Sequence, residues 1–441
     1  MLRLAFVATL SLGLLACGPR TPPRPDAGVE EDAGMMEVDA GRQRGDDPPV
    51  GWQLAVPLPT GAGASTRLGP STASAPDQFA QPLIATLFED PNGDLNYDDN
   101  RVVFTRWDGA AKAFTALQTV EVVGGAASQH PNRQISIARD ESTGRIGIAY
   151  VKPQDNVIRL AVSDDEGTNF SLSTVSDGTA ALVSNPALAM RNGEVHVAWL
   201  QGSSLEYRKR VGSGAFMPTS PGAIVTGGKP VALALDGDGN PGVAFFSFVA
   251  PSSAELAFWR PGAAPSVVAT ADMLDLDNLD RYPSVSLTFV GTTAHLAYHL
   301  RKVPPLMMAD DTTELWYAKA TDAAGTAWST PVAIPRNGSA TAFHSTRYYQ
   351  AITVDASGRV NVAANLATTG GASTACGGPK LARAADGTSF TTCSPMGSPI
   401  QQGGAWISMW PHKAGKQTVI FAYETRSNPS IGAGIVMWRE P

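Results

Sequence analysis

The chain has 441 residues, of which 43% are hydrophobic and 17% are charged, and its formal net charge is −7. The length allows a large hydrophobic core. The mild acidic balance argues against a nucleic-acid partner, because nucleic-acid binding uses a basic face.

Residues 1–16 have the pattern of a secretion signal, with a positive residue followed by an apolar run over 4–15. The run is too short to cross a bilayer as a helix, which needs about 20 apolar residues. Its end, Leu14-Leu15-Ala16-Cys17, resembles the lipobox of bacterial lipoproteins. The resemblance implies lipidation of Cys17 and a membrane partner, and Gly18 favours the outer membrane of the cell envelope. An ordinary signal peptide with a chance cysteine is the alternative.

Residues 17–50 are rich in proline and repeat the tripeptide Asp-Ala-Gly, with few bulky apolar side chains. Such a segment cannot bury a core, and proline and like charges extend it. The sequence therefore predicts a disordered tether that begins at the lipidated cysteine and leads to a folded domain over 51–441.

A four-residue, largely apolar motif with alanine at its third position recurs through this domain. Recurrence of strands at about 40–50 residues or a little more is typical of a β-propeller. A small side chain at this position would let neighbouring sheets approach closely. The repeated alanines are Ala85, Ala149, Ala198, Ala244, Ala297, Ala363 and Ala422.

Each repeat follows the same order of strand, glycine turn, alanine strand, loop, third strand, turn and fourth strand. This order, without sustained helical periodicity, predicts an all-β fold of four-stranded antiparallel blades. The fourth strands are predicted to begin at Phe114, Phe170, Phe216, Ala264, Trp328 and Phe390.

The last repeat ends after its third strand, over residues 435–439, and its missing partner is found at the start of the domain. The segment Trp52–Pro59 is similar to Trp328–Pro335, which ends the fifth repeat. We therefore expect an N-terminal strand to complete the last of seven blades and close the ring, which removes open strand edges. The first innermost strand is expected within 66–75, and a six-bladed ring is the alternative.

The segment from Ser163 to Phe170 resembles the Asp-box (BNR-type) hairpin of sialidase-like propellers, with Asn169 and Phe170 in place of Thr and Trp. Weaker copies occur over 321–328 and 383–390. The resemblance implies a structural role for Ser163, Asp165, Gly167 and Phe170, on the face opposite a sialidase active site.

The sialidase catalytic set does not carry over to this chain. The family has an arginine ahead of its first blade, whereas the similar Arg281-Tyr282-Pro283 lies in the fifth repeat. No catalytic residue is therefore assigned, and a binding module is favoured over an enzyme.

Long loops are predicted over 90–99, 301–313, 366–378 and 425–434, on one sector of one face, where function usually resides. The alternative is that these exposed loops vary in length without serving a function. The first of these loops resembles the calcium loops of integrin-type propellers, with oxygen-bearing side chains at alternate positions. No cofactor is otherwise required, and a solvated acidic loop is the alternative. The calcium ligands would be Asp90, Asn92, Asp94, Asn96 and Asp98.

Several arginine and aromatic residues are candidates for ligand binding near the central channel, where they could form a sugar-stacking or peptide-binding platform. Packing between blades is the alternative for the aromatic ones. Cys376 and Cys393 are expected to form a disulfide between hairpin neighbours in an oxidising compartment, with free thiols as the alternative. The candidate ligand-binding residues are Arg281, Arg301, Arg347, Tyr348, Tyr349, Trp406 and Trp410.

These patterns favour a lipid-anchored cell-envelope propeller that binds a glycan or an envelope protein. The enzyme alternative is a sialidase-like glycosidase or a polysaccharide lyase that works in the central funnel. The structural alternative is a scaffold within an envelope complex, which a broad apolar patch on the outer blade edges would indicate.

Overall fold

The computed structural model divides the chain into two compact units, Met1–Gln43 and Arg44–Pro441. Its described residues all belong to the second unit. Within them, no helix has the length and apolar character needed to span a membrane. The described residues are 47–57, 71–88, 98–124, 135–178, 181–221, 231–250, 253–271, 284–302, 312–334, 350–366, 378–390, 392–396, 404–413, 415–423 and 434–441.

The described residues form seven antiparallel sheets, each a blade of a β-propeller, which confirms the predicted all-β seven-bladed fold. Blade 1 contains β2 (Thr72–Pro76), β3 (Pro82–Phe88), β4 (Arg101–Asp108), β5 (Ala113–Phe114) and β6 (Gln118–Val122). Blade 2 contains β7 (Ile135–Arg139), β8 (Ile146–Lys152), β9 (Val157–Ser163) and β10 (Ser171–Thr174). Blade 3 contains β11 (Val183–Arg191), β12 (Glu194–Gln201), β13 (Ser204–Val211) and β14 (Met217–Pro218).

The remaining four blades follow in chain order. Blade 4 contains β15 (Ala232–Leu235), β16 (Pro241–Ala250), β17 (Ser253–Trp259) and β18 (Ser266–Ala271). Blade 5 contains β19 (Val285–Val290), β20 (Thr293–Lys302), β21 (Thr312–Lys319) and β22 (Val332–Ala333). Blade 6 contains β23 (Gln350–Val354), β24 (Val360–Leu366), β25 (Gly378–Ala384) and β26 (Thr392–Pro395). Blade 7 contains β27 (Gly404–Lys413), β28 (Lys416–Tyr423), β29 (Gly434–Arg439) and β1 (Gly51–Pro57).

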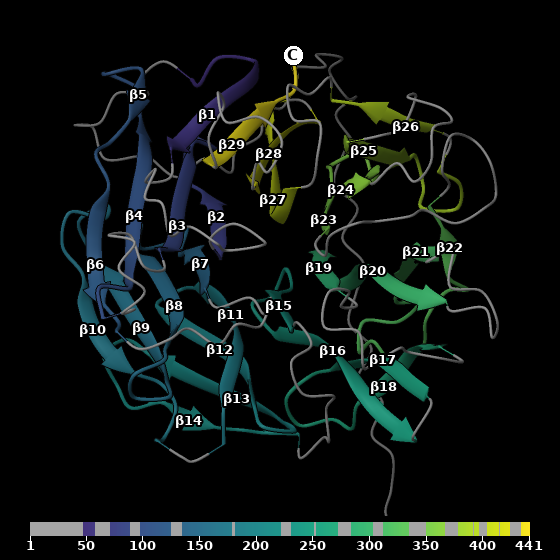
Figure 1. Ribbon diagram of the computed structural model, residues 1–441. Helices are drawn as coiled ribbons and strands as arrows, with labels where there is room; N and C mark the ends of the chain where they lie inside the picture. The colour runs from purple at the N-terminus through teal and green to yellow at the C-terminus, as the bar shows by residue number, and fades with distance from the viewer. Residues whose placement is uncertain are drawn as a thin grey trace, which may run out of the picture. The chain divides into compact units, whose positions relative to one another are not determined.

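The blades are joined through their innermost strands. Each innermost strand contacts that of the next blade, from β2 through β7, β11, β15, β19 and β23 to β27, and β27 contacts β2 again (Figure 1). Two ends of the ring can then be distinguished. We call the end with the second-to-third-strand connections and the connections between blades the loop face. The opposite end, with the first-to-second and third-to-fourth-strand turns, is the turn face.

The N-terminal strand closes the ring as predicted. β1 pairs with β29 in antiparallel register, with Gly51 opposite Arg439 and Pro57 opposite Gly434. The indole of Trp52 also reaches blade 6, where it donates a hydrogen bond to Met396 O at 2.8 Å. The closing strand is therefore fixed to two neighbouring blades.

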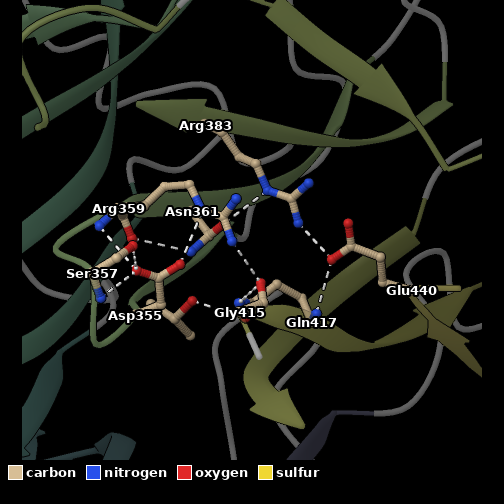
Figure 2. A network of polar contacts seen from close by, with 9 residues as sticks. Asp355, Ser357, Arg359, Asn361, Arg383, Gly415, Gln417 and Glu440 are labelled. Carbon is tan, nitrogen blue, oxygen red and sulfur yellow. Dashed lines mark hydrogen bonds and ion pairs between the residues drawn. The ribbon is translucent and has the colours of Figure 1, made fainter. Parts of the chain in front are cut away.

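A network of polar side chains ties blade 6 to blade 7 at the turn face (Figure 2). Arg359 donates to the carboxylate of Asp355 at 2.9 Å and to Gly415 O at 3.1 Å. Arg383 pairs with the carboxylate of Glu440, which also accepts from Gln417 N at 2.9 Å. Glu440, the penultimate residue of the chain, therefore helps to hold blades 6 and 7 together.

The repeated alanines occupy the interior of the blades. Ala85, Ala149, Ala198, Ala244, Ala297 and Ala363 have 0% exposure. Because the second strand of each blade is covered by neighbouring sheets, a small side chain allows close approach there. The burial agrees with the packing reason given for the repeat.

The turn over Ser163–Phe170 forms a hydrogen-bonded unit at the turn face. Gly167 N donates to Ser163 Oγ at 2.7 Å, and Asn169 N donates to Asp165 Oδ1 at 2.8 Å. Phe170 packs edge-on against Phe104 of blade 1, with ring centroids 5.5 Å apart. Gly167 lies against the same ring, so the turn joins two blades.

The fourth strands differ in detail from the predicted starts. In blade 1, both β5 and β6 pair with β4, and the Thr105 hydroxyl donates to Thr115 O at 2.7 Å between the two outer segments. Such side-chain bonds compete with the strand ladder. Trp328 forms only an isolated bridge with Ala320, and β22 starts later. The first innermost strand, β2, overlaps the end of its predicted range.

Candidate functional site

Most of the predicted ligand and metal residues lie outside the described residues. Asp98 is described and exposed, and it interacts with other groups of the protein. The part of the chain that the structure describes contains no group of three or more His, Cys, Asp or Glu that could hold a metal. The calcium site therefore stays a prediction. The residues outside the described ranges are Cys17, Asp90, Asn92, Asp94, Asn96, Arg281, Arg347, Tyr348, Tyr349 and Cys376.

Two further predictions fall on residues whose backbone alone is described. Arg301 lies on β20, opposite Thr313 of β21, near the loop-face end of blade 5. Cys393 lies on β26, opposite Ala382. Its disulfide with Cys376 stays a prediction, because that partner lies outside the described residues.

Trp406 and Trp410 lie inside the ring. Their side chains are 2% and 4% exposed, in the core cluster that includes Ala55 and Val56 of the closing strand. The indole of Trp410 donates to Ala80 O of blade 1 at 3.0 Å. The structure therefore places both in the inter-blade core, which was the stated alternative, and a buried indole is not available as a stacking surface.

A buried polar cluster at the loop face joins blades 5 and 6. It consists of His299 on β20, Ser284 just before β19 and Gln350 at the start of β23, with 1%, 1% and 4% exposure. Gln350 Nε2 donates to the carbonyl oxygens of Ser284 and Ala297, at 3.0 and 2.6 Å. We call His299, Ser284 and Gln350 the seam cluster.

Two carbonyl oxygens fix the orientation of the Gln350 amide, because a carbonyl can only accept. The other end of the amide, Oε1, therefore accepts from His299 Nδ1 at 2.9 Å and from the Ser284 hydroxyl. His299 thus carries its proton on Nδ1. Its Nε2 has no hydrogen-bond partner among the described residues.

The seam cluster contains serine and histidine but does not have the arrangement of a nucleophilic site. In such sites the hydroxyl faces Nε2 and the orienting group faces Nδ1. Here Ser284 Oγ lies 3.1 Å from Nδ1 of His299, and both residues are buried. The arrangement holds strand ends together and offers no exposed nucleophile.

The seam cluster holds the ends of two segments that carry predicted ligand residues. Arg281-Tyr282-Pro283 directly precedes Ser284, and Arg347-Tyr348-Tyr349 directly precedes Gln350. In both cases an Arg-Tyr pair begins three residues before the residue of the seam cluster, Ser284 or Gln350. The sequence signals single out these segments but give no indication of His299, which lies in an apolar strand.

The other buried histidines described in blades 3 and 5 pair with tyrosines. His196 Nδ1 lies 2.6 Å from Tyr207 OH, and His295 Nδ1 lies 2.7 Å from Tyr317 OH. Burial lowers the pKa of each of these histidines to about 4. Their equivalent positions and contacts agree with a structural role.

Because these histidines are buried in their neutral form, we expect the protein to lose stability in acid. Burial also lowers the pKa of His299 to about 4, whereas the unfolded side chain titrates near 6.5. As pH falls from about 6.5 to 4, the unfolded state binds protons that the folded state excludes, so the free energy of unfolding falls. We expect a decrease of about 3 kcal/mol for each histidine, levelling off below pH 4. Urea titrations from pH 7.5 to 4 measure it; a constant unfolding free energy would contradict the expectation.

The carboxylates with shifted pKa values all shift downward in the described residues. At Asp140, burial acts to raise the pKa, but hydrogen bonds from Gly193 N and Ser142 outweigh it. A glycosidase general acid needs a raised pKa. The shifted carboxylates are Asp140, Asp165, Asp177, Asp236, Asp322, Asp355 and Asp386.

A scan against protein-family models finds no matching family, and a search of curated proteins finds no match. Among solved structures, the chain is similar to the BP39L lectin from Burkholderia pseudomallei, with 12% identity, a TM-score of 0.49 and coverage of 80% of this chain and 92% of that chain. It is similar to the GH93 α-L-arabinofuranosidase of Fusarium graminearum, with 10% identity, a TM-score of 0.49 and coverage of 88% and 97%. The polysaccharide lyase Uly1 has 12% identity, a TM-score of 0.48 and coverage of 83% and 88%.

Proposed function

We propose that this propeller is a binding module for carboxylate-bearing glycans, with its site at the loop face of blades 5 and 6. The observation that supports the proposal is the seam cluster. In this cluster, Ser284 and Gln350 are buried, hydrogen-bonded residues on adjacent blades. Each of them directly follows a segment that contains arginine and tyrosine. Arginine pairs with carboxylates in a bidentate manner, and tyrosine rings stack on sugars.

In the described residues, the carboxylates with shifted pKa values all favour the ionised form. Asp236 illustrates the pattern, because Arg260 and the backbone of Asn240 and Asp238 donate to it and outweigh the effect of burial. A carboxylate held in this way stays ionised and cannot serve as a general acid at neutral pH. In the described residues, the shifted carboxylates are therefore suited to holding turns.

A scaffold role has less support. In the described outer strands, half-exposed apolar side chains occur one at a time on separate blades, as with Leu172, Met217 and Val267. Single exposed apolar side chains are normal on protein surfaces.

The experiment is a glycan array probed with the purified chain, followed by titration with tetragalacturonate and its methyl ester. We expect retention of carboxylated glycans, and binding of the ester that is at least about tenfold weaker because its carboxylates are neutralised. The double variant Arg347→Ala/Tyr348→Ala should lose binding. Arg145→Ala, which removes an exposed pair with Asp164 at the turn face, is the matched control and should bind normally. Equal binding of acid and ester, or an empty array, would refute the proposal.

Lipidation of Cys17 would hold this module at the cell envelope, a part of the proposal that rests on the lipobox resemblance. Metabolic labelling with a palmitate analogue tests it. We expect label in the membrane fraction of cells that express the wild type, and none for Cys17→Ala.

A further inference from the structure

We propose that Asn192 is a site of spontaneous deamidation, which Asp140 of the neighbouring blade suppresses and whose modification releases a contact between blades 2 and 3. The inference goes beyond the proposed function and does not depend on it. The geometry that carries it is a single tight turn at the turn face, together with the chemistry of the Asn-Gly pair that forms this turn.

The reactive pair forms the two-residue turn between β11 and β12. Of the three Asn-Gly pairs in the sequence, Asn192-Gly193 is the one that lies within the described residues. Asn192 is exposed, and the two residues have φ +54° and +75°. Positive φ at both positions fits a type I′ turn, in which Asn-Gly is favoured. Glycine also has no side chain that would hinder attack by its own amide nitrogen.

Deamidation at this pair forms one bond and breaks another. The Gly193 nitrogen loses its proton and attacks Cγ of Asn192, which closes a five-membered succinimide ring and expels the side-chain nitrogen as ammonia. Water then opens the ring, either to aspartate or, predominantly, to isoaspartate, in which the backbone runs through the former side-chain carbonyl and gains one carbon. The first step therefore needs a Gly193 N–H that can give up its proton.

Asp140 holds that N–H. Its buried carboxylate accepts from Gly193 N at 2.6 Å and from Asn192 N at 3.0 Å. Burial acts to raise the pKa of Asp140, but the bonds from Gly193 N and Ser142 hold it below its ordinary value, so the carboxylate is charged near neutral pH. Loss of the Gly193 proton would place a second negative charge beside this carboxylate, which is electrostatically unfavourable. Asp140 should therefore slow the first step.

The same two bonds join neighbouring blades. Asp140 follows β7 of blade 2, whereas Asn192 and Gly193 connect two strands of blade 3. Isoaspartate at position 192 would lengthen the backbone of the two-residue turn and move Gly193 N relative to Asp140. The modified turn should therefore lose its bonds to blade 2.

Mass spectrometry of the tryptic peptide over 192–208 measures the reaction. The purified chain is incubated in mildly alkaline heavy-oxygen water, which labels only the residues that lose their amide during the incubation. The variant is Asp140→Ala and the matched control is Asp355→Ala. Asp355 follows the first strand of blade 6 and accepts from Ser357 N at 3.0 Å, as Asp140 does from Ser142 N, but its bonds are with its own turn.

Asp140→Ala should deamidate at Asn192 at least about tenfold faster than wild type, because it lacks the charge-assisted bond to Gly193 N. Asp355→Ala should keep the wild-type rate. Equal rates in wild type and a folded Asp140→Ala, or an equal rise in Asp355→Ala, would overturn the inference. If Asp140→Ala does not fold, Asp140→Asn gives the same decision, since it keeps the shape but removes the charge and should also react faster than wild type. Its new amide falls in a separate tryptic peptide, over 140–145.

Hydrogen exchange tests the release of the contact. Anion exchange separates the deamidated wild type, which carries an additional negative charge, from the unmodified protein. Peptides over 140–145 should exchange at least about tenfold faster in the deamidated protein, because Asp140 has lost its partners, while peptides over 355–359 should exchange equally in both. Equal exchange over 140–145 would refute the release, and a uniform rise over both ranges would show general unfolding in its place.

Discussion

Replacement of Gly167 with alanine should destabilise the propeller by about 2–5 kcal/mol, by two additive mechanisms. The residue has φ +86°, a conformation that costs alanine about 1–2 kcal/mol. Its added Cβ would also lie 2.8 Å from Cζ of Phe104, which belongs to the preceding blade. Forcing that contact apart costs a further amount of about 1–3 kcal/mol. Urea denaturation measures the loss.

Gly262 is the matched control for this substitution. It has φ +88°, and a Cβ placed on it would have nothing within 4 Å. Gly262→Ala should therefore show only the conformational cost. In the Gly167→Ala background, Phe104→Leu should recover part of the loss, because the two positions share one contact. Equal losses for Gly167→Ala and Gly262→Ala would show that the inter-blade contact contributes nothing.

Deletion of the closing strand should disrupt the whole ring. A chain that begins at residue 58 lacks the buried side chains of Ala55 and Val56 and leaves the edge of β29 unpaired. Open edges of this kind promote aggregation. We expect this chain to be insoluble or to melt at least about 10 °C below a chain that begins at residue 47.

A peptide supplied in trans sharpens the experiment. A peptide of residues 47–57 can add to β29 as a strand and should raise the melting temperature of the shortened chain. The same peptide with Val56→Asp is the control, because residue 56 is buried and a charge there should prevent docking. An unchanged melting temperature with both peptides, or a shortened chain as stable as the longer one, would contradict the role of β1.

The sequence predicted the architecture well because the repeats obey simple physical rules. The repeated alanine of the second strands is fully buried, as at Ala149 and Ala198, where a small side chain suits the packing of neighbouring sheets. The closing strand was predicted because Trp52–Pro59 resembles the end of the fifth repeat. Each signal is local in the chain, even though the strands it joins are far apart.

The sequence predicted less of the candidate site. The seam cluster unites Ser284, His299 and Gln350 from three separate segments of the chain, and no fixed spacing marks such a group. The tryptophans do have a sequence signal, but that signal fits both a binding surface and an inter-blade core. Trp406 and Trp410 are of the residue type that forms binding surfaces, but both are buried in the core, and Trp406 has φ +56° where the pairing register of β27 shifts.

The entry of the N-terminal strand has a further consequence. Arg439 is buried and donates to Pro48 O at 2.6 Å, so the chain before β1 begins its course at the turn face. Asp47 also pairs with the Arg439 guanidinium at 3.2 Å. Residues 47 and 48 are therefore fixed to the end of β29 before the closing strand begins, so the folded part of the chain starts ahead of its first strand.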